Sequence, residues 1–187
     1  LKYLNDFLQL ELEQATKLTE RKQSWIVHDL ETELKSTMTL GERTILLKGQ
    51  ADRIDEIDNT IRIIDYKTGK AEDRELKVNN WFDFNTDANL NKSFQLLMYA
   101  YMYERGGKPL KGLLQSGIIT FRELKSGLKT VKTISDKNHL GKEELNTFEK
   151  QLSEMLTELF APEVDFIQTD DVDRCKLCAY KEVCNRG

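Results

Sequence analysis

Apolar residues recur along the first third of the chain with two different spacings. Over residues 1–19 they fall every three or four positions, which predicts a helix. After a polar break, residues 43–57 and 60–67 carry aliphatic and β-branched side chains that predict two strands. Asp58-Asn59 lies between the two strands and predicts a tight turn, because Asn tolerates a positive φ.

The second half of the chain continues the alternation of helices and strands. Residues 93–105 are apolar on almost every side, which predicts a buried helix. Residues 117–123 and 128–134 indicate a hairpin, and a long amphipathic helix then runs up to Pro162. This order of elements predicts an α/β fold with one mixed central β-sheet flanked by helices.

The sequence predicts one domain with an appendage. No composition shift divides residues 1–169, and we expect the short Cys-rich tail, residues 170–187, to be part of the same domain. The chain begins at Leu1 in what already reads as a helix and no signal peptide opens it, so we expect a fragment of a longer protein. The longest apolar runs are far short of a bilayer span, so we expect no membrane association.

Charge and cysteine content narrow the possible functions. The 187 residues have a net charge of −4, and the isoelectric point is near 5.4. The chain therefore lacks the basic composition typical of DNA-binding domains, and a polyanion would have to be held by a local basic patch or by bound cations. The 3 Cys all lie near the end of the chain. An odd cluster is a poor disulfide framework and indicates a reduced, cytoplasmic setting with metal-ligand cysteines.

Two carboxylates are expected to face each other across the first hairpin. If Ile57 pairs with Thr60, then counting back from the turn pairs Asp52 with Asp65, with Cβ atoms about 4.5–5.5 Å apart. Lys67 points to the same face. Like charges in this position are destabilising unless a divalent cation such as Mg²⁺ or Mn²⁺ lies between them. The group suits phosphodiester hydrolysis; the alternative is that both aspartates are ordinary solvated strand residues.

Three motifs carry a resemblance to a known family. They are, in order, Gly49-Gln50-Ala51-Asp52-Arg53-Ile54-Asp55, then Ile64-Asp65-Tyr66-Lys67-Thr68-Gly69-Lys70, and then Gln95-Leu96-Leu97-Met98-Tyr99. They match G-x-x-D-R-x-D, D-Y-K-T-G and Q-x-x-x-Y, so residues 43–103 resemble the RecB/AddB-type branch of the PD-(D/E)xK nuclease superfamily. Each motif alone is modest, whereas the three in this order are highly specific. The resemblance implies a restriction-endonuclease-like core.

The resemblance also implies roles for individual residues. Asp52 and Asp65 would bind Mg²⁺ or Mn²⁺, with the backbone carbonyl of Tyr66 as a further ligand. Lys67 would be the catalytic lysine. The remaining pair, Gln95 and Tyr99, lies one helical turn apart and would contact the DNA backbone or brace the active site; the alternative is polar residues that simply pack in a buried helix. The family often adds an upstream Glu or His, for which Glu11, Glu31, Glu33 and His28 are all open candidates.

The tail has its own motif. Cys175, Cys178 and Cys184 follow the pattern C-x₂-C-x₅-C, whereas a zinc site or an iron–sulfur cluster normally has four ligands. The tail resembles the C-terminal signature of AddB-type nucleases, which implies a [4Fe–4S] cluster whose fourth ligand is not in this chain; a Zn²⁺ site is the alternative. The third possibility is three unrelated thiols.

Several side chains are candidates for contact with DNA. Arg53, Lys70 and Lys92 lie nearest to the expected active face. The stretch from Trp81 to Phe84 either stacks on bases or anchors a loop to the core.

Taken together, these features predict a divalent-metal-dependent deoxyribonuclease. The resemblance implies the exonuclease-type domain of a DNA repair or recombination protein, with DNA and a helicase domain or subunit as partners. One alternative is a non-catalytic DNA-binding or scaffolding module of a larger repair complex. A further alternative, based on the tail alone, is a zinc-ribbon-like interaction module.

Overall fold

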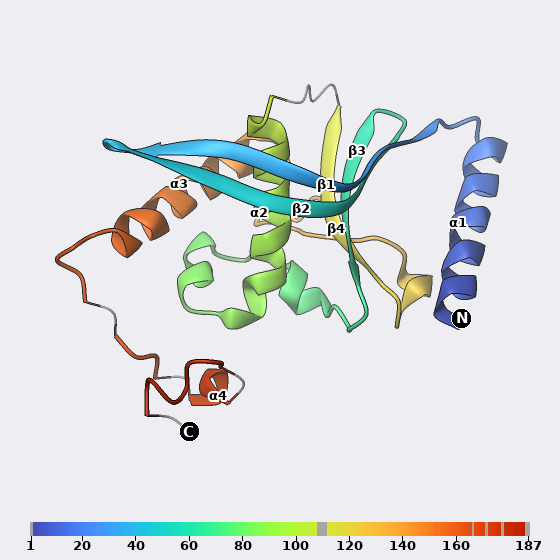
Figure 1. Ribbon diagram of the computed structural model, residues 1–187. Coiled ribbons are helices and arrows are strands. Elements are labelled where there is room, and N and C mark those ends of the chain that lie inside the picture. Colours follow the sequence, from blue (N-terminus) through green and yellow to red (C-terminus); the bar gives the residue numbers. More distant parts are fainter. Residues whose placement is uncertain (1, 108–111, 166, 171, 177, 186–187) are drawn as a thin grey trace. The chain divides into compact units, whose positions relative to one another are not determined.

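A five-stranded mixed sheet organises the chain in the computed structural model, which describes residues 2–107, 112–165, 167–170, 172–176 and 178–185. The strands follow one another across the sheet in the order β1-β2-β3-β4-β5. Only β3 and β4 run parallel; the other neighbours are antiparallel. The predicted α/β fold, a mixed sheet flanked by helices, is confirmed (Figure 1).

The bounds of α1, β2, β3, α2 and α3 lie close to those expected from the sequence, whereas the long strand β1 was not predicted. The strands are β1 (Trp25–Leu40), β2 (Arg43–Ile57), β3 (Thr60–Lys67), β4 (Leu113–Thr120) and β5 (Lys129–Thr130). The helices are α1 (Lys2–Glu20), α2 (Asn91–Arg105), α3 (Lys142–Leu159) and α4 (Val172–Cys175). Short 3₁₀ turns are η1 (Asp73–Leu76), η2 (Trp81–Asn85), η3 (Ala88–Leu90) and η4 (Leu124–Ser126). The predicted hairpin of residues 117–134 differs most, since β4 begins earlier and β5 is short.

The turn between β2 and β3 sets the register that was expected. Asp58 and Asn59 have φ values of 44° and 63°, the left-handed region used by two-residue hairpin turns. Ile57 pairs with Thr60, and the ladder continues to the pair formed by Arg53 and Ile64. The positions of Asp52 and Asp65 come directly after that pair.

Helices lie on both faces of the sheet. On one face α1 packs its Phe7 ring against Tyr66 and Phe121, with ring centroids 5.4 and 5.6 Å apart. On the other face lies α2, whose side chains are largely buried as its all-round apolar sequence predicts. Figure 1 shows α1 (blue) and α2 (green) on opposite sides of the strands.

The loop between β3 and α2 is held to the core by aromatic side chains. Trp81 and Phe84 lie against Phe148 of α3, with centroids 6.5 and 6.1 Å away. Phe82 between them is exposed. The anchoring alternative is therefore confirmed for Trp81 and Phe84, which fix the loop that leads into α2.

The chain divides into two units, Leu1–Met155 and Leu156–Gly187. The predicted organisation, one domain over residues 1–169 with an attached tail, stays a prediction. In the described part of the chain no helix combines the length and the apolar character needed to cross a membrane.

Candidate active site

Adjacent strands bring Asp52 and Asp65 together. Asp52 stands near the middle of β2 and Asp65 near the end of β3. The backbone N–H of Tyr66 donates a hydrogen bond of 2.6 Å to Asp52 Oδ2, which ties the first carboxylate to the residue that follows the second. The pKa of Asp65 also responds to the charge of Asp52, as expected for neighbouring acids.

Lys67 completes a group of three charges. Its Nζ lies 2.8 Å from Asp65 Oδ2, because residues two apart on a strand point to the same face. Asp65 is only 4% exposed. Burial raises the pKa of Asp65, Lys67 acts against this rise, and Asp52 adds to it. Burial therefore disfavours the charged form of Asp65 more than Lys67 favours it.

Helix α2 supplies the two polar residues of the third motif. Gln95 Nε2 donates to Asp65 Oδ1 at 3.3 Å and to the hydroxyl of Tyr99 at 2.7 Å. Burial raises the pKa of Tyr99, and the Asp65 carboxylate adds to the rise. The pair thus braces Asp65 from the helix, one of the two roles considered for it.

A glycine allows α2 to come this close to the sheet. A Cβ on Gly49 would lie 2.7 Å from Met102 Cε and 2.9 Å from Tyr99 Cε1, so a side chain there would displace the Tyr99 ring or the methionine tip. The motif glycine therefore has a packing role that the sequence did not reveal.

The donor groups fit a hard divalent cation in part. Asp65 Oδ2 is buried and, among the described residues, accepts no hydrogen bond of good geometry, although Lys67 Nζ is near. Carboxylate and carbonyl oxygens are the ligands that Mg²⁺ and Mn²⁺ prefer. Within the same described part, no three His, Cys, Asp or Glu side chains gather closely enough to hold a metal ion. A cation would therefore use the two aspartates together with groups of another kind, such as the Tyr66 carbonyl.

Of the three predicted DNA-contacting residues, Arg53 is not at the site. Its side chain is 5% exposed and lies 2.7 Å from Glu11 of α1, on the sheet face opposite Asp52. The expectation that Arg53 contacts DNA is corrected, because successive strand residues point to opposite faces and this one is buried in ion pairs. Lys92 lies beside Lys70, donating to its carbonyl at 2.9 Å and to Glu75 at 2.6 Å.

The open candidates for an upstream ligand have partners other than the two acids. Glu11 pairs with Arg53, Glu33 with Lys35 and His28 with Glu56. Glu31 accepts from Gln50 and has a φ of 48° in the middle of β1. In the described part of the chain, none of the four forms a hydrogen bond or an ion pair with Asp52 or Asp65.

The three cysteines of the tail are all free thiols. Cys175 and Cys184 are partly buried and Cys178 is exposed. Within the second unit, Gln168 donates to the Cys184 carbonyl at 3.0 Å, and the Tyr180 amide lies 3.4 Å from Cys178 Sγ. The predicted metal or cluster site at the three sulfurs stays a prediction.

Comparisons with known proteins identify the family. A model of the PD-(D/E)XK nuclease superfamily matches residues 2–185, so the chain belongs to that superfamily, and membership indicates a nuclease. A search of curated proteins finds no match. One solved structure, titled "Crystal structure of SSO0001", is similar at 16% identity and a TM-score of 0.39, covering 97% of this chain and 68% of that one.

Proposed function

We propose that this chain hydrolyses phosphodiester bonds in DNA with the help of Mg²⁺ or Mn²⁺. The observation that carries the proposal is the meeting of Asp52, Asp65 and Lys67 at the end of β3, braced by Gln95 and Tyr99. Membership of the PD-(D/E)XK superfamily supports the same activity.

Each residue has a role that follows from its surroundings. Asp52 and Asp65 would hold the cation, with the Tyr66 carbonyl as a further ligand. When bound, the cation would polarise a phosphoryl oxygen and make a neighbouring water easier to deprotonate. Lys67 neutralises Asp65 in the structure. With the acid otherwise balanced, its ammonium group is available to stabilise negative charge that develops on the phosphate. Gln95 keeps Asp65 oriented throughout.

The finer parts of the proposal rest on the motifs. We propose an exonuclease-type domain of the RecB/AddB kind, acting in DNA repair or recombination beside a helicase domain or subunit, in a reducing, cytoplasmic setting. Lys70 and Lys92 are the DNA contacts kept in this proposal, since Lys70 is exposed and both follow the strand that carries Asp65. The three tail cysteines would bind a [4Fe–4S] cluster or Zn²⁺ with a fourth ligand from outside this chain.

Cleavage assays on linear and covalently closed circular DNA test the proposal. With Mg²⁺ or Mn²⁺ we expect wild-type chain to degrade linear DNA and to leave the circle intact. Asp65→Ala and Lys67→Ala should each lower the rate by about 100-fold or more, because the first removes a ligand of the cation and the second removes the ammonium group that stabilises charge on the phosphate. Lys125→Ala is the matched control, since Lys125 is exposed in η4. Equal cleavage by wild type and both site variants would overturn the proposal, and cleavage of the circle would overturn its exonuclease part.

The alternative is a module that binds DNA without cutting it. The Asp65–Lys67 ion pair supports this alternative, because it neutralises one of the two acids without a metal ion. DNA binding that is indifferent to divalent cations, with no turnover at any metal concentration, would identify this alternative.

A further inference from the structure

A group of buried charges lies on the sheet face opposite the two acids. Asp55 is fully buried, and Arg62 binds it through two hydrogen bonds of 2.6 Å. The indole N–H of Trp25 donates to the same carboxylate at 2.9 Å, and Arg53 Nη2 lies 2.5 Å from it. Two arginines and one aspartate leave an excess positive charge, which Glu11 balances.

This group is joined to the site through the backbone. Arg53 directly follows Asp52, and Tyr66 directly follows Asp65. Arg53 Nη1 donates to the Tyr66 hydroxyl at 3.2 Å, while the Tyr66 amide donates to Asp52 Oδ2 at 2.6 Å. Strands β2 and β3 are therefore joined at these residues by two hydrogen bonds. One, from Arg53 to the Tyr66 hydroxyl, lies on the face away from the site, and the other, from the Tyr66 amide to Asp52, lies at the site.

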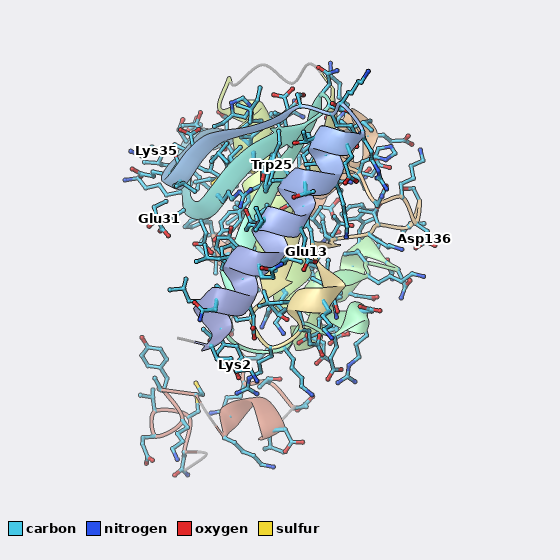
Figure 2. The ribbon with its side chains drawn as sticks, turned by 90° about the vertical axis from the view of Figure 1, so that its right-hand side faces the viewer. Lys2, Glu13, Trp25, Glu31, Lys35 and Asp136 are labelled. Carbon is cyan, nitrogen blue, oxygen red and sulfur yellow. The ribbon has the colours of Figure 1, made fainter. Side chains whose placement is uncertain are left out.

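Helix α1 packs on this buried group and contacts both Arg53 and Tyr66. Glu11 Oε2 lies 2.7 Å from Arg53 Nη1, and Phe7, one helical turn earlier, packs edge-on against the Tyr66 ring. Figure 2 shows α1 in front of the strands. Burial alone would lower the pKa of Arg53, but Asp55 and Glu11 outweigh it and raise the pKa, so the guanidinium stays charged. Burial raises the pKa of Tyr66, so its hydroxyl stays protonated.

We infer that Glu11, Arg53 and the Tyr66 side chain are positioning residues: they hold β2 and β3 together so that the Tyr66 amide keeps Asp52 beside Asp65 for a divalent cation. The inference rests on the proposed function for the cation itself. It assigns to α1, which carries none of the site residues, a part in setting metal affinity. Residues that orient a ligand in this way commonly change metal affinity when they are altered.

Two conservative variants of the full chain test this inference. Tyr66→Phe removes the hydroxyl and leaves the packed ring, and Glu11→Gln removes the charge and keeps an oxygen acceptor. Tyr3→Phe and Glu13→Gln are the matched controls, because both residues are exposed on α1. Calorimetric titration with Mn²⁺ alone measures metal affinity, and amide hydrogen exchange at residue 66, relative to residue 64, measures the hydrogen bond to Asp52.

We expect both variants to bind Mn²⁺ about tenfold more weakly than wild type and to exchange the residue 66 amide about fivefold faster, with the controls unchanged. Variants that melt earlier but keep wild-type Mn²⁺ affinity or wild-type exchange would overturn the inference, since the group would then serve stability alone.

If wild type binds Mn²⁺ but cuts no DNA, the nuclease proposal fails, and the Mn²⁺ affinities of the variants still decide the inference. If wild type binds no Mn²⁺, the proposed function fails, and exchange at residue 66 alone decides: faster exchange supports positioning and unchanged exchange overturns it.

Discussion

Asp65 is the residue on which the site's electrostatics depend. Its side chain is buried under α2, forms an ion pair with Lys67 and accepts a hydrogen bond from the Gln95 amide. Burial favours its neutral form, and the nearby Asp52 charge acts in the same direction. A carboxylate held in this way gains from any cation that replaces its missing solvent.

This predicts how stability changes with pH. The pKa of Asp65 is raised in the folded chain, so this group binds more protons in the folded state than in the unfolded state, and its contribution to stability falls as pH rises above about 4, the ordinary pKa of Asp. Asp65→Asn removes this loss. We expect the variant to gain stability relative to wild type across that range. Urea denaturation at several pH values in EDTA measures the difference. A stability difference that is constant with pH would contradict the prediction.

Gly49 offers a second prediction at this scale. In Gly49→Ala the new methyl group would approach Met102 and the Tyr99 ring, and such overpacking costs about 1–3 kcal/mol of unfolding free energy. Because Tyr99 braces Gln95, DNA cleavage should fall as well. Gly69→Ala is the stability control, since nothing lies within 4 Å of its added Cβ, and urea denaturation should place it within about 0.5 kcal/mol of wild type. Equal stability of the two variants would show that α2 shifts freely.

Some of these residue positions were predictable and others were not. The approach of Asp52, Asp65 and Lys67 followed from the turn and from the two-residue period of a strand. The same period places Arg53 on the other face from Asp52, so the expectation of a DNA contact there was wrong for a reason already present in the alternation. The hydrogen bond from the Tyr66 amide to Asp52 uses a backbone N–H. Almost every residue type has this group, so the sequence could not reveal the bond.

At the scale of elements, the β2–β3 hairpin carries the site. Its bounds matched the sequence because apolar runs stop at the turn residues on both sides. The beginning of β4 was missed because Gln115 and Ser116 interrupt its apolar run, although Ser116 is buried in the sheet. The short turns η1 to η3 have no periodic pattern, and their place is set by contacts with α2 and α3 that a local sequence does not show.

The turn between β2 and β3 gives a prediction about stability. Asn59 has a φ of 63°, which β-branched residues avoid, so Asn59→Val should cost about 1–2 kcal/mol of unfolding free energy. Asn59→Gly is the control and should stay near wild type, because glycine adopts this φ freely. Thermal or urea unfolding compares the two. A valine variant as stable as wild type would mean that the turn does not fix the register.

The whole molecule binds a polyanion, on our proposal, with a net charge of −4. Three of its lysines form ion pairs, Lys67 with Asp65, Lys92 with Glu75 and Lys129 with Glu123, and Lys92 would exchange Glu75 for a phosphate on binding DNA. Bound divalent cations would add positive charge directly at the two acids. The acidic composition, which excluded an ordinary basic DNA-binding domain, is consistent with a metal-dependent enzyme.

The tail can be separated from this site by experiment. If the cysteines bind a cluster or zinc, the chain purified anaerobically together with the segment that supplies the fourth ligand should contain iron or zinc. Cys178→Ser should lose most of it, whereas Ser153→Ala should not. The two aspartates lie in the first unit and the cysteines in the second, so a chain ending at Thr169 should keep its helical circular dichroism and its Mn²⁺ affinity. Loss of Mn²⁺ binding in the folded, shortened chain would instead tie the metal to the tail and favour an interaction module over a nuclease.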